Sequence, residues 1–238
     1  MPPDTVKKEA PMTHPHNEAP INPLPPVVAA LFLVLAGIEL VIWLGGQGIV
    51  GGPGAVGWRT SAIETYAFSG RAFDWMLETG QYPPEHLLRF VAYLFLHPSF
   101  SHGLFSMVIL LAMGKIVAES VGSLVFLAVF FVSGIVGAIG FGLFSDDPWL
   151  VGAFPGVYGL IGGFTFLLWV RLGNEGAPQV RAFTLIGMLL AVQLVFGVLF
   201  GGGSDWIADV VGFVTGFALT VLLAPGGVAR VLERIRRR

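Results

Sequence analysis

The sequence predicts an all-α polytopic membrane protein: a bundle of six membrane-spanning helices with a long interfacial loop between the first and second spans. Hydrophobic residues make up 55% of the 238 residues and charged residues only 12%, whereas a soluble domain has about 25% charged residues. Six apolar stretches reach roughly the 20 residues that a helix needs to cross a bilayer. They are residues 27–46, 101–119, 123–144, 151–170, 180–200 and 206–224. Because lipid offers the backbone no hydrogen-bond partners, each stretch is expected to be helical.

The basic residues set the expected orientation. Of the 13 lysines and arginines, Arg59, Arg71 and Arg89 lie between the first two spans, and the remaining ten fall on the other side of a six-span bundle. Cytoplasmic loops of membrane proteins are enriched in Lys and Arg. We therefore expect an integral protein of a bacterial inner (plasma) membrane with both termini in the cytoplasm.

Two tails and one long loop flank the spans of the membrane domain, residues 27–225. Residues 1–26 are proline-rich and lack the apolar core of a signal peptide, so a disordered cytoplasmic tail is expected. The arginine-rich residues 226–238 are expected to lie on anionic lipid headgroups as a basic interfacial tail. The connection 49–88 mixes aromatic and charged residues, which predicts a loop half-immersed in the outer interface.

Glycines at spacings of three and four residues predict where helices approach closely, because small residues let backbones touch in lipid. Such faces occur in the third, fourth and sixth spans. Their glycines are Gly134, Gly137 and Gly140, then Gly152, Gly156, Gly159 and Gly163, and finally Gly212 and Gly216. The fourth and sixth spans are expected to cross tightly, which would gather Phe154, Tyr158 and Asp209 near the outer membrane surface.

Few polar side chains fall inside the spans, and each is a functional candidate because polar groups are costly in lipid. His102 and Ser106 are four residues apart and share a helical face. Asp209 needs a partner, for which His102 and the Tyr158 hydroxyl are candidates; alternatively it caps the start of the sixth span. Gln193 predicts an interhelical hydrogen bond.

Glu39 in the first span is a candidate contact for a bound partner helix. The chain has no cysteine and no HExxH-type spacing, so neither a metal site nor a cofactor is expected. His97, His102 and Asp209 are the three residues that a zinc site would have to use.

Residues 88–225 carry a set of short motifs in a fixed order. These are 90–102, which ends in His97-Pro-Ser-Phe-Ser-His102; Gly114 with Glu119 and Gly122; Ser133-Gly134 with Gly137; Gly156-Val-Tyr158-Gly159; and Gly212 with Gly216. Together they resemble the rhomboid family of intramembrane serine proteases.

The resemblance implies a catalytic serine in a Gly-x-Ser-Gly turn at the start of the fourth span and a histidine base at the start of the sixth. It also implies a histidine and an asparagine for the oxyanion site on the second span, and an aromatic one turn below the serine. On this chain the serine position is Phe154, followed by Pro155, and the base position is Asp209. The oxyanion positions are His102 and Ser106, and the aromatic is Tyr158.

Phenylalanine is no nucleophile, and aspartate is a poor base for a serine hydroxyl. We therefore expect no catalytic residues and a rhomboid-like pseudoprotease in contact with membrane lipids but not with nucleic acid. Family membership implies that it binds transmembrane segments of other proteins near the second and fifth spans, or serves as a subunit of a membrane complex. The enzymatic alternative is a serine endopeptidase with a rearranged triad of Ser106, His102 and Asp209.

Overall fold

The computed structural model describes residues 23–200, 202–229 and 236. Most of both expected tails therefore lies outside the described residues, and the first helix begins at Pro26, at the boundary expected for the N-terminal tail. The long apolar helices are α1 (Pro26–Gly46), α5 (Phe100–Val121), α6 (Ser123–Phe144), α7 (Phe154–Asn174), α8 (Thr184–Phe200) and α9 (Asp205–Leu223).

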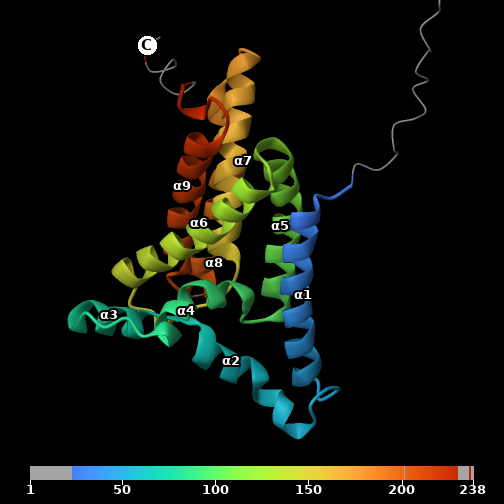
Figure 1. Cartoon of the computed structure of the whole chain (residues 1–238), viewed down its shortest axis with the longest axis vertical. Helices are drawn as coiled ribbons and strands as arrows, with labels where there is room; N and C mark the ends of the chain where they lie inside the picture. The colour runs from blue at the N-terminus through green and yellow to red at the C-terminus, as the bar shows by residue number, and fades with distance from the viewer. Residues whose placement is uncertain (1–22, 201, 230–235, 237–238) are drawn as a thin grey trace, which may run out of the picture.

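The all-α membrane fold is confirmed. Helices α1, α5, α6, α7 and α9 are each long and apolar enough to cross a membrane. Helix α8 has 17 residues and begins at Thr184, because residues 179–183 form the 3-10 turn η4 (Gln179–Phe183) in place of helix. In Figure 1, α7 ends at the top of the bundle and α9 begins at the bottom. The chain must return along the bundle between them, so the sixth span stays a prediction that rests on α8.

The connection between α1 and α5 is folded rather than open. Its elements are η2 (Pro53–Gly57), α2 (Trp58–Tyr66), β1 (Phe68–Ser69), α3 (Gly70–Thr79), α4 (Pro84–Ala92) and η3 (Tyr93–Phe95). They lie together at the lower end of the bundle (Figure 1). Trp58, Tyr66 and Trp75 are exposed there, as interfacial aromatics would be.

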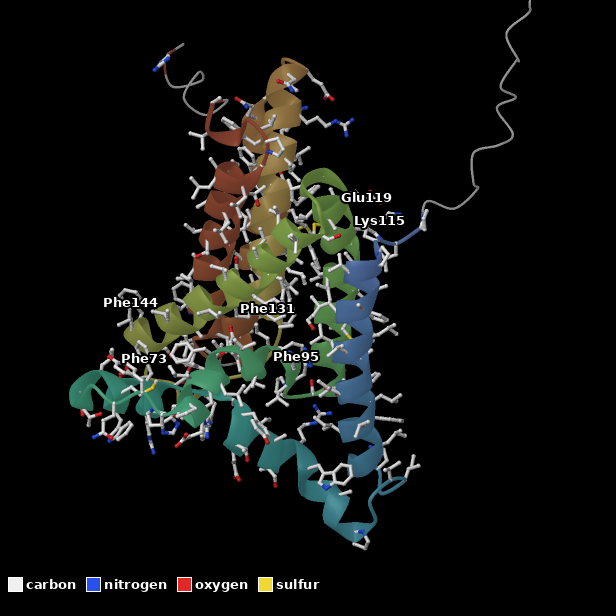
Figure 2. The ribbon with its side chains drawn as sticks, viewed as in Figure 1. Phe73, Phe95, Lys115, Glu119, Phe131 and Phe144 are labelled. Carbon is white, nitrogen blue, oxygen red and sulfur yellow. The ribbon has the colours of Figure 1, made fainter. Side chains whose placement is uncertain are left out.

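Two of its contacts attach this loop to α6 and to the segment before α7. Strand β1 pairs antiparallel with β2 (Trp149–Leu150), with Phe68 opposite Leu150, so the loop joins the segment that leads into α7. Phe73 of α3 packs against Gly142 of α6, where a Cβ would strike its ring, and Figure 2 shows this ring between the two helices. The loop therefore fixes the lower ends of α6 and α7, where the candidate site lies.

Helices α7 and α9 cross in direct backbone contact. A Cβ on Gly216 would overlap the Gly159 carbonyl oxygen, and a Cβ on Gly212 would overlap that of Pro155. Only glycine permits this approach, because it has no Cβ. Close packing of this kind is what holds helices together in lipid, where no hydrophobic drive acts between them. Gly156 of α7 also lies against Phe130 of α6. The crossing sets Phe154 and Asp209 at the same end of the bundle.

We predict that cysteine labelling places the two ends of α8 on opposite sides of the membrane. The native chain has no cysteine, so single substitutions Glu175→Cys, before α8, and Gly202→Cys, after it, give an unambiguous readout. An impermeant maleimide should label each in sealed vesicles from a different side. Labelling of both from one side would reduce the count to five spans.

We also predict that Gly216→Ala lowers the free energy of unfolding in detergent by about 1–3 kcal/mol, the usual cost of overpacking a filled interior. Gly37→Ala on α1 is the matched control, because nothing lies within 4 Å of a Cβ there. This control should be neutral or stabilising, since alanine favours helix by up to about 1 kcal/mol. Equal effects of the two changes would contradict a tight crossing.

Candidate functional site

The turn before α7 brings Phe154 against His102. Gly152 has φ +119°, a left-handed conformation that glycine adopts readily, and a Cβ on it would strike the His102 ring. Its N–H donates to the Tyr93 carbonyl at 3.0 Å. This turn delays the start of α7 to Phe154, three residues later than the sequence suggests. The imidazole of His102 thus lies on the turn that precedes α7.

The Phe154 ring occupies the place beside His102. The two ring centroids are 4.6 Å apart with the planes perpendicular, which is the edge-to-face geometry that aromatic rings prefer. Tyr158, one turn further on, has its ring 6.3 Å from Phe154 and is buried. The position therefore offers packing and no nucleophile. His102 Nδ1 is buried without a hydrogen-bond partner among the described residues.

Asp209 is almost completely buried, with 2% of its surface exposed. Its Oδ2 accepts a hydrogen bond from Nε2 of Gln193 on α8 at 2.7 Å, so the interhelical bond expected of Gln193 is confirmed. Neither His102 nor Tyr158 makes a described hydrogen bond to this carboxylate. The capping role is wrong, because Asp209 lies in the second turn of α9 and the N-cap residue is Ser204.

Ser106 is hydrogen-bonded to a different histidine from the one that the sequence suggests. Its Oγ lies 3.1 Å from Nε2 of His97 and donates to the Gly103 carbonyl at 2.8 Å. His97 Nδ1 lies 3.6 Å from Oε2 of Glu39. The structure therefore aligns a hydroxyl, an imidazole and a carboxylate from α5, the His97 segment and α1.

Burial argues against catalysis by this series. Ser106 is 0% exposed, so no substrate reaches its oxygen in this conformation. Its one hydroxyl proton can be donated to the Gly103 carbonyl or to Nε2 of His97. The second direction needs the His97 tautomer that carries its proton on Nδ1, toward Glu39.

Glu39 is held inside the protein by Arg59 of α2. Arg59 Nη2 lies 2.6 Å from Oε1 and Nη1 lies 3.2 Å from Oε2, and Nη1 also donates to the His97 carbonyl at 2.5 Å. The Glu39 residue is only 3% exposed. The Glu39 carboxylate is therefore already paired within the chain, and a contact of Glu39 with a partner helix stays a prediction.

The rearranged triad of Ser106, His102 and Asp209 is not assembled by any described hydrogen bond. Ser106 is bonded to His97, Asp209 to Gln193, and the His102 ring faces Phe154. In residues 23–200 and 202–229, no three His, Asp or Glu side chains are grouped closely enough to hold a metal ion.

Comparison with known proteins agrees with the motifs. The family model described as "Rhomboid domain" matches residues 84–226, which is more than half of the chain. The chain belongs to the rhomboid family. It is an integral membrane protein of that family.

Two curated relatives are similar to this rhomboid. "Rhomboid-like protease 3" of Toxoplasma gondii is 33% identical over 136 residues, covering 56% of this chain and 50% of that protein. "RHOMBOID-like protein 4" of Arabidopsis thaliana is 34% identical over 131 residues, covering 54% of this chain and 32% of that protein. The match thus spans half or less of the length of these relatives.

Two functional partners were missed by sequence reasoning, Arg59 for Glu39 and Gln193 for Asp209. A signal existed for each. Arg59 is one of only three basic residues between the first two spans. Basic residues are scarce on the side expected to be the outer one, so a buried acid is a plausible partner for each. Gln193 is the one amide within the apolar stretch 180–200. Neither signal identifies which acid each side chain meets.

We predict that Arg59→Met lowers the free energy of unfolding by about 2–4 kcal/mol, because it leaves a buried carboxylate without its cation. Arg71→Met is the control, an exposed arginine in the same loop, and it should change little. Adding Glu39→Gln to Arg59→Met should recover part of the loss. A double variant less stable than Arg59→Met alone would contradict the pairing.

Proposed function

We propose that this rhomboid is a pseudoprotease that binds transmembrane segments of other membrane proteins without cleaving them. The observation that carries the proposal is the Phe154 ring, which stands at the nucleophile position and packs 4.6 Å from the His102 ring. Peptide hydrolysis at that place needs an oxygen nucleophile and room for the substrate carbonyl. Phenylalanine supplies neither.

The rest of the site supports the same function. Asp209 stands at the base position in place of a histidine. Its hydrogen bond to Gln193 attaches α8 to α9. Removing one member of a serine-protease triad leaves little activity, and both the nucleophile and the base are replaced here. The chain nevertheless belongs to the rhomboid family, so we expect its fold to present this site to a transmembrane helix.

Exposed apolar stripes on α5 and α8 supply the docking surface. They consist of Phe100, Leu104 and Val108 on α5 and of Met188, Val192, Val195 and Leu199 on α8. Among the residues that the structure describes, helix α8 has no extensive interface with α5. A client helix entering between them would bury both stripes. Roles in client stability or assembly, or as an accessory subunit of a membrane complex, follow from such binding.

The membrane and orientation belong to the same proposal. We place the protein in a bacterial inner membrane with both termini in the cytoplasm, which the excess of basic residues on that side supports. The loop from η2 to α4 then lies at the outer surface. Clients would be engaged near that surface, at the level of Phe154.

We predict that a fluorophosphonate probe does not label the purified protein, because Ser106 is inaccessible and its proton is engaged. The measurement is gel fluorescence after incubation with probe, with an active serine hydrolase as positive control. Labelling that Ser106→Ala abolishes and Ser101→Ala leaves intact would instead establish a serine enzyme built on Ser106 and His97.

We further predict that Val192→Trp reduces co-purification of membrane proteins in mild detergent by about threefold or more, the scale of one interhelical contact. Val34→Trp, the same change at a similarly exposed valine on α1, should leave it unchanged. Quantitative mass spectrometry of intact captured proteins is the readout. Purification of the native chain with no associated membrane protein would reject the proposed function.

A further inference from the structure

The altered site holds two hydrogen-bond acceptors that nothing in the described chain satisfies. They are Oδ1 of Asp209 on α9 and Oε1 of Gln193 on α8, and both are buried. The two side chains are already joined through Oδ2 and Nε2, so the free oxygens belong to one pair. A group that bonds both must be a donor, since carboxylate and amide oxygens only accept.

The pair also lacks a positive charge. The carboxylates of Glu39, Glu119 and Glu175 each face a basic side chain, but in the described residues Asp209 receives only the neutral amide of Gln193. A buried carboxylate held by one neutral bond is poorly compensated. Intramembrane acids are ordinarily paired with a cation or line a functional path.

Further acidic groups stand at the outer end of the same helices. A Cβ on Gly203, between α8 and α9, would lie 3.4 Å from Oδ2 of Asp147 and 3.7 Å from Oδ1 of Asp205. Asp205 is four residues before Asp209 and shares its helical face. Three carboxylates therefore follow one another from the outer end of α9 into the membrane.

The geometry around Gln193 shows how a second helix reaches this place. The exposed residues Met188, Val192 and Val195 flank Gln193 along α8, and the Gln193–Asp209 bond is the one described side-chain hydrogen bond from α8 to another long helix. A client helix that shifts α8 outward would therefore reach the two free oxygens of this pair.

We propose that the client is a transmembrane helix that carries a lysine or arginine about one turn inside its outer end. Its charged N–H groups donate to Oδ1 of Asp209 and Oε1 of Gln193. The position follows from α9, where Asp209 lies four residues, or about 6 Å, below the first residue. Lys and Arg side chains are long enough to reach such a depth from a neighbouring helix. This inference rests on the proposed function and names the chemistry of its client.

The test uses the full chain in phosphatidylcholine vesicles with synthetic leucine–alanine host helices. The helices carry one guest residue (Lys, Gln or Leu) a turn inside the outer end. Because the chain has no cysteine, a dye on Glu78→Cys of α3 reports binding by energy transfer. The Lys helix should bind about three- to fifteen-fold more tightly than the Leu helix, the range for interhelical polar contacts.

Asp209→Asn separates charge from hydrogen bonding, because it is isosteric and keeps an acceptor for Gln193. In this variant the Lys and Leu helices should bind with about equal affinity, whereas the Gln helix should keep its higher affinity relative to the Leu helix. Asp74→Asn, the same change at an exposed site on α3, should keep the Lys preference. Gln193→Leu should also keep it, since both Asp209 oxygens are then free, and thermal melting checks that each variant is folded.

The outcomes distinguish this inference from the proposed function. Equal binding of Lys and Leu helices, or a Lys preference that survives Asp209→Asn, overturns the basic client while host binding itself stands. Failure of every host helix to bind rejects client binding altogether. A native dimer that Asp209→Asn dissociates in the absence of peptide would make a second copy of the chain the occupant, which also overturns the inference.

Discussion

The contact of α7 with α9 at backbone distance is the constraint on which the rest of the structure depends. Gly216 against Gly159 and Gly212 against Pro155 leave no room for a methyl group. This crossing sets the start of α7 beside the start of α9, and therefore brings Phe154 and Asp209 to one end of the bundle. Without it, Phe154 and Asp209 would be unrelated residues in separate spans.

The polar and aromatic groups of the candidate site are engaged in contacts between helices. Phe154 fills the space beside His102 by ring contact, and Asp209 secures α8 by a hydrogen bond. The remaining polar side chains form a separate series, Arg59, Glu39, His97 and Ser106, which connects the outer loop, α1 and α5. Groups with the composition of a catalytic site thus serve to hold helices together in lipid.

The sequence predicted well what depends on local composition. Apolar length located α1, α5, α6, α7 and α9, and the spacing of Gly212 and Gly216 located a close crossing, because both properties belong to single segments. The start of α7 was misplaced since the conformation of Gly152 is set by the His102 ring from another helix. The partner of Glu39 was missed for a similar reason. Arg59 lies 20 residues away, in a loop whose fold cannot be inferred from the spacing of its apolar residues.

The salt bridge between Arg59 and Glu39 has a consequence for the unit that folds. Both residues precede Pro84, where the region shared with other rhomboids begins, yet they surround His97 within that region. A chain shortened to residues 84–226 would lose the only described carboxylate facing His97 and the guanidinium that fixes its carbonyl. The contacts that hold His97 in place therefore extend back to α1, beyond the residues that the family model matches.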